Sequence, residues 1–176
     1  MTLNSQVKRI APGGPGIEPR WTRGAKVAVG TAYSTSSRIW YTHDSGCVTE
    51  VYYPTIDTPQ VRDLQFLFTD GKTFFHDERR SLCTQVDCIS ETVSLGFEVT
   101  SREKEGRYTL NKTIIGDPHQ NCLLVHTRIE ASAELLSNLK VYVLCAPHLE
   151  IGGWHNNGQV LSNMWVTPFR FCVERF

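Results

Sequence analysis

Short apolar or alternating segments recur along the chain from Gly24 onward, separated by polar turns at a spacing of roughly ten residues, as in all-β domains. The segments are rich in Val, Ile, Thr, Phe and Tyr, which favour strands. They span residues 26–33, 38–42, 47–53, 63–69, 72–76, 93–103, 107–115, 122–131 and 139–147. This pattern predicts an all-β domain built as an antiparallel β-sandwich.

Apolar and polar residues alternate within FEVTSRE, RYTLNKT and LVHTRIE, which indicates sheets with one buried and one solvated face. The dipeptides Asp70-Gly71 and Glu105-Gly106 fit β-hairpins, because Gly tolerates the positive φ of a tight turn. We find no helical periodicity apart from residues 131–138, which have room for one turn. Without helices between the strands, a parallel α/β fold is not expected.

The charge balance limits the possible partners. The 176 residues carry 18 Lys+Arg and 18 Asp+Glu, so the formal net charge is zero. A neutral chain has no long-range field to attract DNA, RNA or an anionic membrane, so we expect no nucleic acid as a partner. The sequence shows neither the apolar core of a signal peptide nor a run long enough to span a membrane, so we expect a cytoplasmic protein.

Six cysteines lie at positions 47, 83, 88, 122, 145 and 172, with irregular spacing and no C-x-x-C pair. Cys122 and Cys145 fall inside apolar strand-like segments, so we expect buried, reduced thiols rather than a disulfide framework. Cys83 and Cys88 are too far apart for a zinc knuckle and have no matching second pair. The histidines form no H-x-x-x-H motif, so the sequence predicts neither a metal site nor a cofactor.

Residues 38–71 carry the most specific motif of the chain. A WYT strand is followed by Gly46, by the octapeptide EVYYPTID at residues 50–57, and by a D-x-x-F-x-x-TDG hairpin that starts at Asp63. This segment resembles the N-terminal β-domain of bacterial glycoside hydrolase family 15, the glucoamylase and glucodextranase group. Supporting segments are APGGPGIEPRWTRGAKVAVGTAY, EGRYTLNKTIIGDP and YVLCAPHLEIGGWHNNG, so the resemblance covers most of the chain.

The resemblance implies a large antiparallel sandwich of the supersandwich type, similar to galactose mutarotase. In the family this domain precedes an (α/α)6-barrel catalytic domain that releases glucose from α-glucans by inversion, with two glutamates of the barrel as acid and base. No part of that barrel lies in this sequence. We therefore expect a non-catalytic accessory domain of a glucan 1,4-α-glucosidase-type hydrolase, inactive alone, with the barrel as its partner.

A stand-alone carbohydrate-binding β-sandwich, with an α-glucan oligosaccharide as its ligand, is the alternative. In either case three stretches can be distinguished. Residues 1–22, rich in Pro and Gly, predict an extended arm, residues 23–160 form the sandwich, and residues 161–176 show no match to the family. Since the family's β-domain continues with further strands, we expect an incomplete sandwich with open sheet edges.

Two carboxylates, Glu50 and Asp57, lie inside the best-matched motif. Nothing in their spacing brings them to the separation that glycoside hydrolysis requires, so we expect no catalytic residue in this chain. The structural interpretation is that Asp57 caps the turn after Pro54, while Glu50 is paired or solvated. Three further carboxylates, Asp63, Asp70 and Glu78, show no catalytic pattern either.

The aromatic residues Trp40, Tyr41, Tyr52 and Tyr53 raise the question of a platform that stacks on sugar rings. Because neighbouring residues in a strand point to opposite faces, core packing is the favoured interpretation. Tyr52, Tyr53 and Asp57 remain candidates for carbohydrate contact. The segment Tyr53-Pro54-Thr55 is in addition a candidate for the interface with the barrel, where Tyr supplies area and a hydroxyl.

The segment GGWHNNG at residues 152–158 has the most site-like composition outside that motif. Trp154, His155, Asn156 and Asn157 combine an aromatic ring with groups that hydrogen-bond to sugar hydroxyls. An ordinary turn, with Asn157-Gly158 supplying positive φ, explains the same residues. Both interpretations stay open at the level of the sequence.

Overall fold

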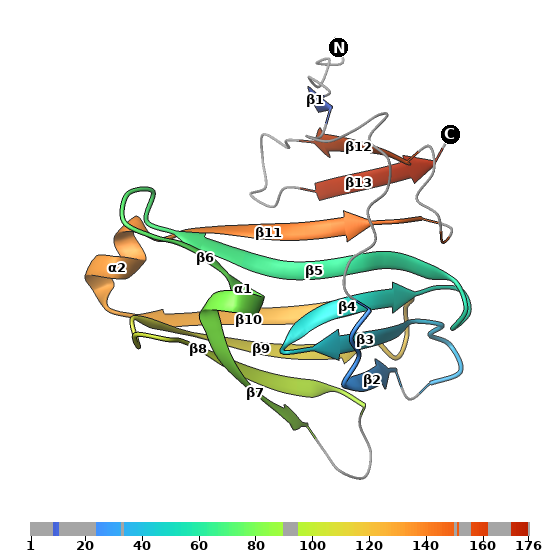
Figure 1. The fold of residues 1–176 in the computed structure, drawn as a ribbon. Helices are drawn as coiled ribbons and strands as arrows, with labels where there is room; N and C mark the ends of the chain where they lie inside the picture. The colour runs from blue at the N-terminus through green and yellow to red at the C-terminus, as the bar shows by residue number, and fades with distance from the viewer. Residues whose placement is uncertain are drawn as a thin grey trace, which may run out of the picture.

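The structure is a computed structural model that describes residues 9–10, 24–32, 34–89, 95–149, 151, 156–161 and 170–175 (Figure 1). For residues 9–10, 156–161 and 170–175 it describes the backbone but not the side chains. Within these residues, every strand pairing is antiparallel. The predicted antiparallel β-sandwich is confirmed.

The first sheet has the strand order β11-β5-β4-β3-β2, with β6 paired to β5. Its strands are β11 (Lys140–Pro147), β5 (Pro59–Thr69), β4 (Cys47–Tyr52), β3 (Trp40–Asp44), β2 (Ala28–Thr31) and β6 (Phe75–Asp77). The second sheet has the order β10-β9-β8-β7, formed by Leu123–Ala131, Tyr108–Gly116, Phe97–Glu103 and Leu82–Cys88. A third, small sheet joins β1 (Arg9–Ile10), β12 (Asn156–Leu161) and β13 (Arg170–Arg175).

Strand β7 is the element of the two main sheets that the apolar pattern does not predict. Its sequence LCTQVDC is mostly polar, and Leu82 is its one buried residue. The strand forms because its backbone pairs with all of β8, from Leu82 opposite Glu103 to Cys88 opposite Phe97. Pairing to an existing sheet edge thus outweighs the weak strand propensity of the segment.

Both predicted hairpin turns are present. Gly71 and Gly106 have φ values of +78° and +76°, the left-handed conformation that a Cβ disfavours. The β5–β6 connection is longer than a two-residue turn, because Asp70 organises residues 70–74. Its carboxylate accepts hydrogen bonds from the backbone N–H groups of Lys72 and Thr73, each at 2.8 Å.

Two short helices interrupt the strands. Helix α1 (Glu78–Ser81) begins after Asp77, whose carboxylate accepts from the backbone N–H groups of its first turn. Helix α2 (Ala133–Asn138) is capped by Ser132, whose hydroxyl accepts from the Leu135 N–H at 3.2 Å. At six residues α2 is longer than the single turn predicted for this segment.

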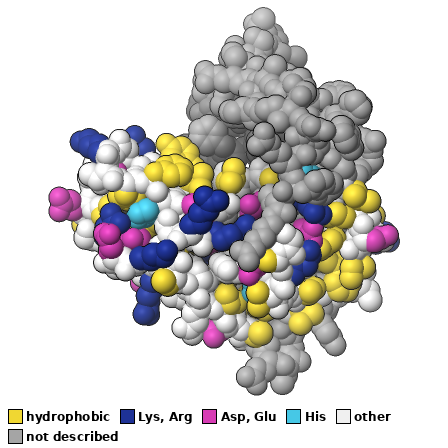
Figure 2. All heavy atoms as spheres, in the orientation of Figure 1, with side chains coloured by type: hydrophobic (Ala, Val, Ile, Leu, Met, Phe, Trp, Pro, Cys, Tyr) yellow, Lys and Arg dark blue, Asp and Glu magenta, His cyan; other side chains and the backbone are white. Residues whose placement is uncertain are grey.

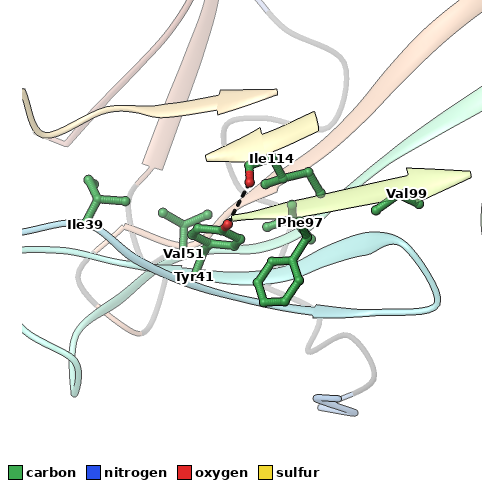
Figure 3. Packing of buried hydrophobic residues seen from close by; sticks show 7 residues of the cluster. Ile39, Tyr41, Val51, Phe97, Val99 and Ile114 are labelled. Carbon is green, nitrogen blue, oxygen red and sulfur yellow. Dashed lines mark hydrogen bonds between the residues drawn. The ribbon is translucent and has the colours of Figure 1, made fainter. Parts of the chain in front are cut away.

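The main core lies between the two sheets, where side chains of β3 and β4 meet those of β8 and β9 (Figure 3). The buried members are Ile39, Tyr41, Val48, Val51, Phe97, Val99 and Ile114. Tyr41 is fully buried, and its hydroxyl donates to the carbonyl of Ile114 in the opposite sheet at 2.9 Å. This bond satisfies the polar end of an otherwise apolar side chain and connects the sheets.

A second core cluster fills the end of the sandwich near the β5–β6 hairpin. Phe68, Leu82, Tyr108 and Leu110 are its buried members, and Phe68 and Tyr108 contact each other with ring centroids 5.0 Å apart. In the two clusters together, the inward-facing apolar side chains of β5, β8 and β9 are buried or partly buried.

Strand β11 differs from the other strands of the first sheet because its apolar side chains are exposed. Within the described residues it pairs with β5 alone, so it forms an edge of that sheet. Val141, Tyr142, Val143 and Leu144 are between 38% and 59% exposed. In the part of the chain described here, no helix is long and apolar enough to cross a membrane.

The prediction that Cys122 and Cys145 are buried is wrong. Cys145 is exposed and Cys122 is half-buried, whereas the fully buried thiol is that of Cys47 on the central strand β4. The physical reason is that β11, which carries Cys145, has a neighbouring strand on one side only within the described residues. Among the described side chains the five cysteines at 47, 83, 88, 122 and 145 are free, and the side chain of Cys172 lies outside the described residues.

Candidate functional site

The best-matched motif, residues 50–57, forms the end of β4 and most of an exposed loop, residues 53–58, at one end of the sandwich. The loop is closed by hydrogen bonds from the Tyr53 N–H to the Thr58 carbonyl at 3.0 Å and from the Thr58 N–H to the Thr55 carbonyl at 3.1 Å. The side-chain amide of Gln60 donates to the Tyr53 carbonyl at 2.7 Å, and the Tyr53-Pro54 peptide bond is cis. These contacts give a well-defined loop that points its side chains outward.

Asp57 lies in this loop as a solvated turn residue. Its carboxylate is fully exposed, and Thr58 donates to it at 3.5 Å. Hydrogen bonding from the Thr55 hydroxyl holds the pKa of Asp57 below its usual range, so it is ionised at neutral pH. Its partners among the described residues, Thr55 and Thr58, are those of a turn.

Glu50 lies at the centre of a buried ion-pair cluster on β4. Its carboxylate, 5% exposed, contacts Lys26 Nζ at 2.6 Å, the guanidinium of Arg62 and the hydroxyl of Tyr52. Burial alone would raise the pKa of Glu50, but the hydrogen bonds from Lys26 and Tyr52 and the Arg62 charge lower it overall. A carboxylate held ionised by two cations has no proton to donate.

The four aromatic residues of the motif do not form one platform. Tyr41 is in the core, whereas Tyr53 is 39% exposed, so core packing is wrong for Tyr53. Trp40 and Tyr52 are opposite each other in the β3–β4 register and are both half-buried. Alternation along the two strands therefore separates Tyr41 from its neighbour Trp40 and places Trp40 beside Tyr52.

Two residues that precede the second candidate segment lie at the same end of the sandwich. The His148 N–H donates to the Gln60 carbonyl at 2.9 Å, and the Ile151 N–H donates to the Pro59 carbonyl at 3.1 Å. His148 and Ile151 therefore lie beside the base of the 53–58 loop. Trp154 and His155 lie outside the described residues, while Asn156 and Asn157 begin β12, where side chains are not described.

The other carboxylates that the sequence offered have structural partners. Asp63 is paired with Arg79 at 3.3 Å and accepts from Gln65 at 3.0 Å. Asp70 organises its loop, and its hydrogen bonds from Thr73 and the backbone lower its pKa. Among the described residues no group of three or more His, Cys, Asp or Glu side chains could hold a metal ion.

An ion pair in the interior, Glu78 with Lys112, was not predicted from the sequence. Glu78 is fully buried and Lys112 is 4% exposed. The Lys112 ammonium contacts the Glu78 carboxylate and donates to the Gly46 carbonyl at 2.5 Å. The Phe66 N–H donates to Glu78 at 2.9 Å. Burial raises the pKa of Glu78, and the Lys112 charge opposes that shift.

The alternating pattern of β9 contained a signal for this pair. Tyr108, Leu110, Lys112 and Ile114 occupy every second position of the strand and all face the core. A lysine in the apolar row of a strand requires a buried acidic partner. Nothing in the sequence around Glu78 identifies that partner, because Glu78 comes from a helix 34 residues away in the chain.

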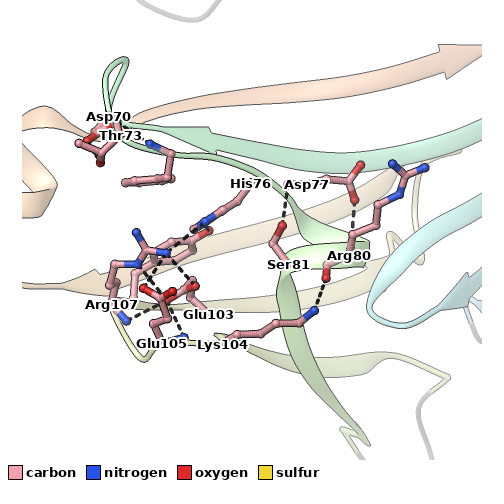
Figure 4. Close-up of polar contacts among 12 residues, drawn as sticks. Asp70, Thr73, His76, Asp77, Arg80, Ser81, Glu103, Lys104, Glu105 and Arg107 are labelled. Carbon is pink, nitrogen blue, oxygen red and sulfur yellow. Dashed lines mark hydrogen bonds and ion pairs between the residues drawn. The ribbon is translucent and has the colours of Figure 1, made fainter.

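A second polar cluster lies at the opposite end of the sandwich, near the β5–β6 hairpin (Figure 4). Arg107 is paired with Glu103 and Glu105, each at 3.2 Å, and its guanidinium lies 4.9 Å from the centre of the Phe74 ring. His76 is 3.0 Å from the Tyr108 hydroxyl. On the surface view, acidic and basic side chains are interspersed rather than segregated (Figure 2).

Taken together, the two-layer antiparallel fold, the engaged carboxylates and the exposed end loop define a structural β-sandwich domain. A family model described as "Glucodextranase, domain N" matches residues 11–167. The chain belongs to this family of glucodextranase N-terminal domains. The matched range begins inside the predicted arm and ends inside the predicted tail.

The chain is similar to longer proteins. It is 37% identical over 152 residues to a glucoamylase of Clostridium sp. (strain G0005), an alignment that covers 86% of this chain and 22% of the relative. It is also similar to the crystal structure of a bacterial glucoamylase complexed with acarbose, with a TM-score of 0.84 and 34% identity, covering 97% of this chain and 25% of that chain. The chain thus spans a quarter or less of the length of both relatives.

Proposed function

We propose that this chain is the accessory β-sandwich of a glucoamylase-type hydrolase, which packs against a separate (α/α)-barrel catalytic domain and performs no chemistry itself. One observation carries the proposal: nearly the whole chain, 97%, matches one quarter of a bacterial glucoamylase. The engaged carboxylates of the described residues support it further, because inverting hydrolysis needs an acid and a base on either side of a bound sugar.

The 53–58 loop is the surface that we assign to the barrel. Tyr53 and Ile56 are 39% and 63% exposed, and Ile151, beside the base of the loop, is 49% exposed. Exposed apolar side chains on a fixed loop are typical of an interface that is covered in a longer protein. We call these three residues the docking patch.

The test uses the 176-residue chain and the catalytic domain of the Clostridium glucoamylase, produced without its own N-terminal part. We expect the two to co-purify and the chain to increase glucose release from maltooligosaccharides. The variant Tyr53→Asp/Ile56→Asp places two charges in the docking patch. It should weaken the association at least about tenfold, since each buried charge costs more than 1.4 kcal/mol.

Phe75→Asp is the matched control. Phe75 is 64% exposed, comparable to Ile56, but it lies beyond the far end of β5, about 33 Å along the strand at 3.3 Å per residue. It should leave the association unchanged. Co-purification that is lost equally in both variants, or never observed, would contradict the proposal.

Two further expectations remain part of the proposal. An α-glucan oligosaccharide contacts Tyr52, Tyr53, Asp57 and residues 154–157. The chain works in the reducing environment of the cytoplasm, in keeping with the exposed, free thiols of Cys83 and Cys88. Thiol titration of the protein as extracted from cells tests the latter.

A further inference from the structure

A hollow of about 630 Å³ opens beside Trp40, at the end of the sandwich that also carries the docking patch. It is lined by Thr31, Ser34, Thr35, Ser37, Trp40 and Leu95. Trp40 begins β3 and is opposite Tyr52, the residue before Tyr53, which places the hollow close to the 53–58 loop. The volume is within the range of small-molecule sites, about 300–1,000 Å³.

Among the described residues that line the hollow, none carries a charged side chain. Four of the residues carry hydroxyl groups. The hydroxyls of Thr31 and Ser37 donate to the carbonyls of Ile39 and Gln120, at 2.7 and 3.0 Å, and each oxygen can still accept. Such a lining does not compensate an ionic ligand, so it favours a neutral one.

Two further groups in the hollow are able to hydrogen-bond to a ligand. They are the indole N–H of Trp40 and the hydroxyl of Thr35. The half-buried indole and Leu95, which is 42% exposed, add apolar surface. A ligand that matches has one apolar face and an edge of hydroxyl groups, as a pyranose ring has.

We infer that the Trp40 hollow binds a glucose unit of an α-linked glucan chain, with the indole against the ring and the Ser and Thr hydroxyls on its edge. The inference rests on the proposed function, because the proposed parent hydrolase acts on α-glucans. Because the hollow is close to the docking patch, a glucan bound there is held near the catalytic partner. The accessory domain thereby raises the local concentration of substrate chain ends.

The experiment titrates the 176-residue chain with maltotriose, followed by two-dimensional NMR of the backbone and indole N–H groups. We expect saturable binding that shifts the Trp40 indole signal. Thr35→Arg should weaken binding at least about tenfold, because the long side chain can lie over the indole and close the hollow. Thr35→Ser, which keeps the hydroxyl and the space, should bind as the original chain does.

Trp40→Leu is a second variant and should also abolish binding, with circular dichroism as the check on its fold. Maltotriose binding that is absent from the original chain, or unchanged in Thr35→Arg, overturns the inference. So does binding that is lost in Trp154→Ala but kept in Thr35→Arg. The docking variant Ile56→Asp, which keeps every proposed glucan contact, should weaken association with the catalytic domain yet retain maltotriose. This result separates failure of this site from failure of the proposed function.

Discussion

Strands β9 and β11 are similar in length and both are rich in apolar residues, yet their environments are opposite. In β9, Tyr108, Leu110 and Ile114 are at most 2% exposed. In β11, Val141 and Val143 are 38% and 59% exposed. The run of apolar residues is longer in β11, so apolar content alone would predict the reverse.

The difference comes from the neighbours of each strand. β9 lies between β8 and β10 and faces the other sheet, so its inward row is covered on all sides (Figure 1). Within the described residues β11 pairs on one side only, with β5. An apolar side chain is buried only where a second layer exists to cover it, and β9 has that layer.

Lys112 shows that even a charged side chain is buried in β9. A lysine is buried there because Glu78 and the Gly46 carbonyl provide it with partners, while Val143 remains exposed on β11. The closed region thus tolerates a charge that is fully paired. Within the described residues, the edge strand β11 leaves even an apolar side chain, that of Val143, exposed.

The largest expected effect is at this buried pair. Lys112→Met removes the cation and leaves Glu78 buried without a counter-charge, which should lower the free energy of unfolding by about 3–5 kcal/mol. Urea denaturation followed by circular dichroism measures the change. The double variant Lys112→Met/Glu78→Gln should recover part of the loss, because the uncompensated charge is gone.

Lys140→Met is the matched control on the open strand. Lys140 begins β11 and is exposed, so its replacement should change the free energy of unfolding by no more than about 0.5 kcal/mol. An equal decrease in the free energy of unfolding for Lys112→Met and Lys140→Met would contradict this contrast between β9 and β11.

A smaller effect of opposite sign is expected at His43, in the closed region. His43 is 1% exposed, contacts Phe97 with ring centroids 4.3 Å apart, and in the described part of the chain neither ring nitrogen has a hydrogen-bond partner. His43→Phe removes these unsatisfied groups and should stabilise the protein by about 1 kcal/mol at neutral pH.

The same variant has a pH signature. Burial and the nearby Lys112 charge lower the pKa of His43, against a weaker opposing effect of Asp44. The unfolded chain therefore binds a proton before the folded one does, and stability falls as the pH drops below 6.5, the ordinary value for His. This part of the pH dependence should vanish in His43→Phe, and a slope that persists unchanged would assign it to other groups.

The smallest effect on stability, but a visible one on association, is expected at the open strand. Val143→Lys puts a charge on the β11 edge and should reduce self-association of the isolated chain, because charged edge strands resist pairing with another copy. Its free energy of unfolding should stay within about 0.5 kcal/mol of the original. Size-exclusion chromatography with light scattering measures the association, and Val143→Thr, which adds no charge, should not reduce it.

Much of the fold was predictable from local patterns. The strands with alternating residues, such as β8 and β9, and the turns at Gly71 and Gly106 follow from side-chain periodicity and positive φ. Strand β7 was not predictable, because its pairing with β8 rather than its own sequence holds it in place. The candidate site was predictable in part: the 53–58 loop follows from its motif, whereas the hollow at Trp40 joins residues 31–40 to Leu95.

The sequence by itself determined the class of fold, the family and the position of the exposed loop, because these depend on residue order over short distances. Only the tertiary structure decided which apolar strands are covered, which lysine is buried, and that His148 and Ile151 lie beside Gln60 and Pro59. The physical reason is that burial and pairing depend on which distant segments meet across the sandwich. The sequence of one strand does not specify which segments will pack against it.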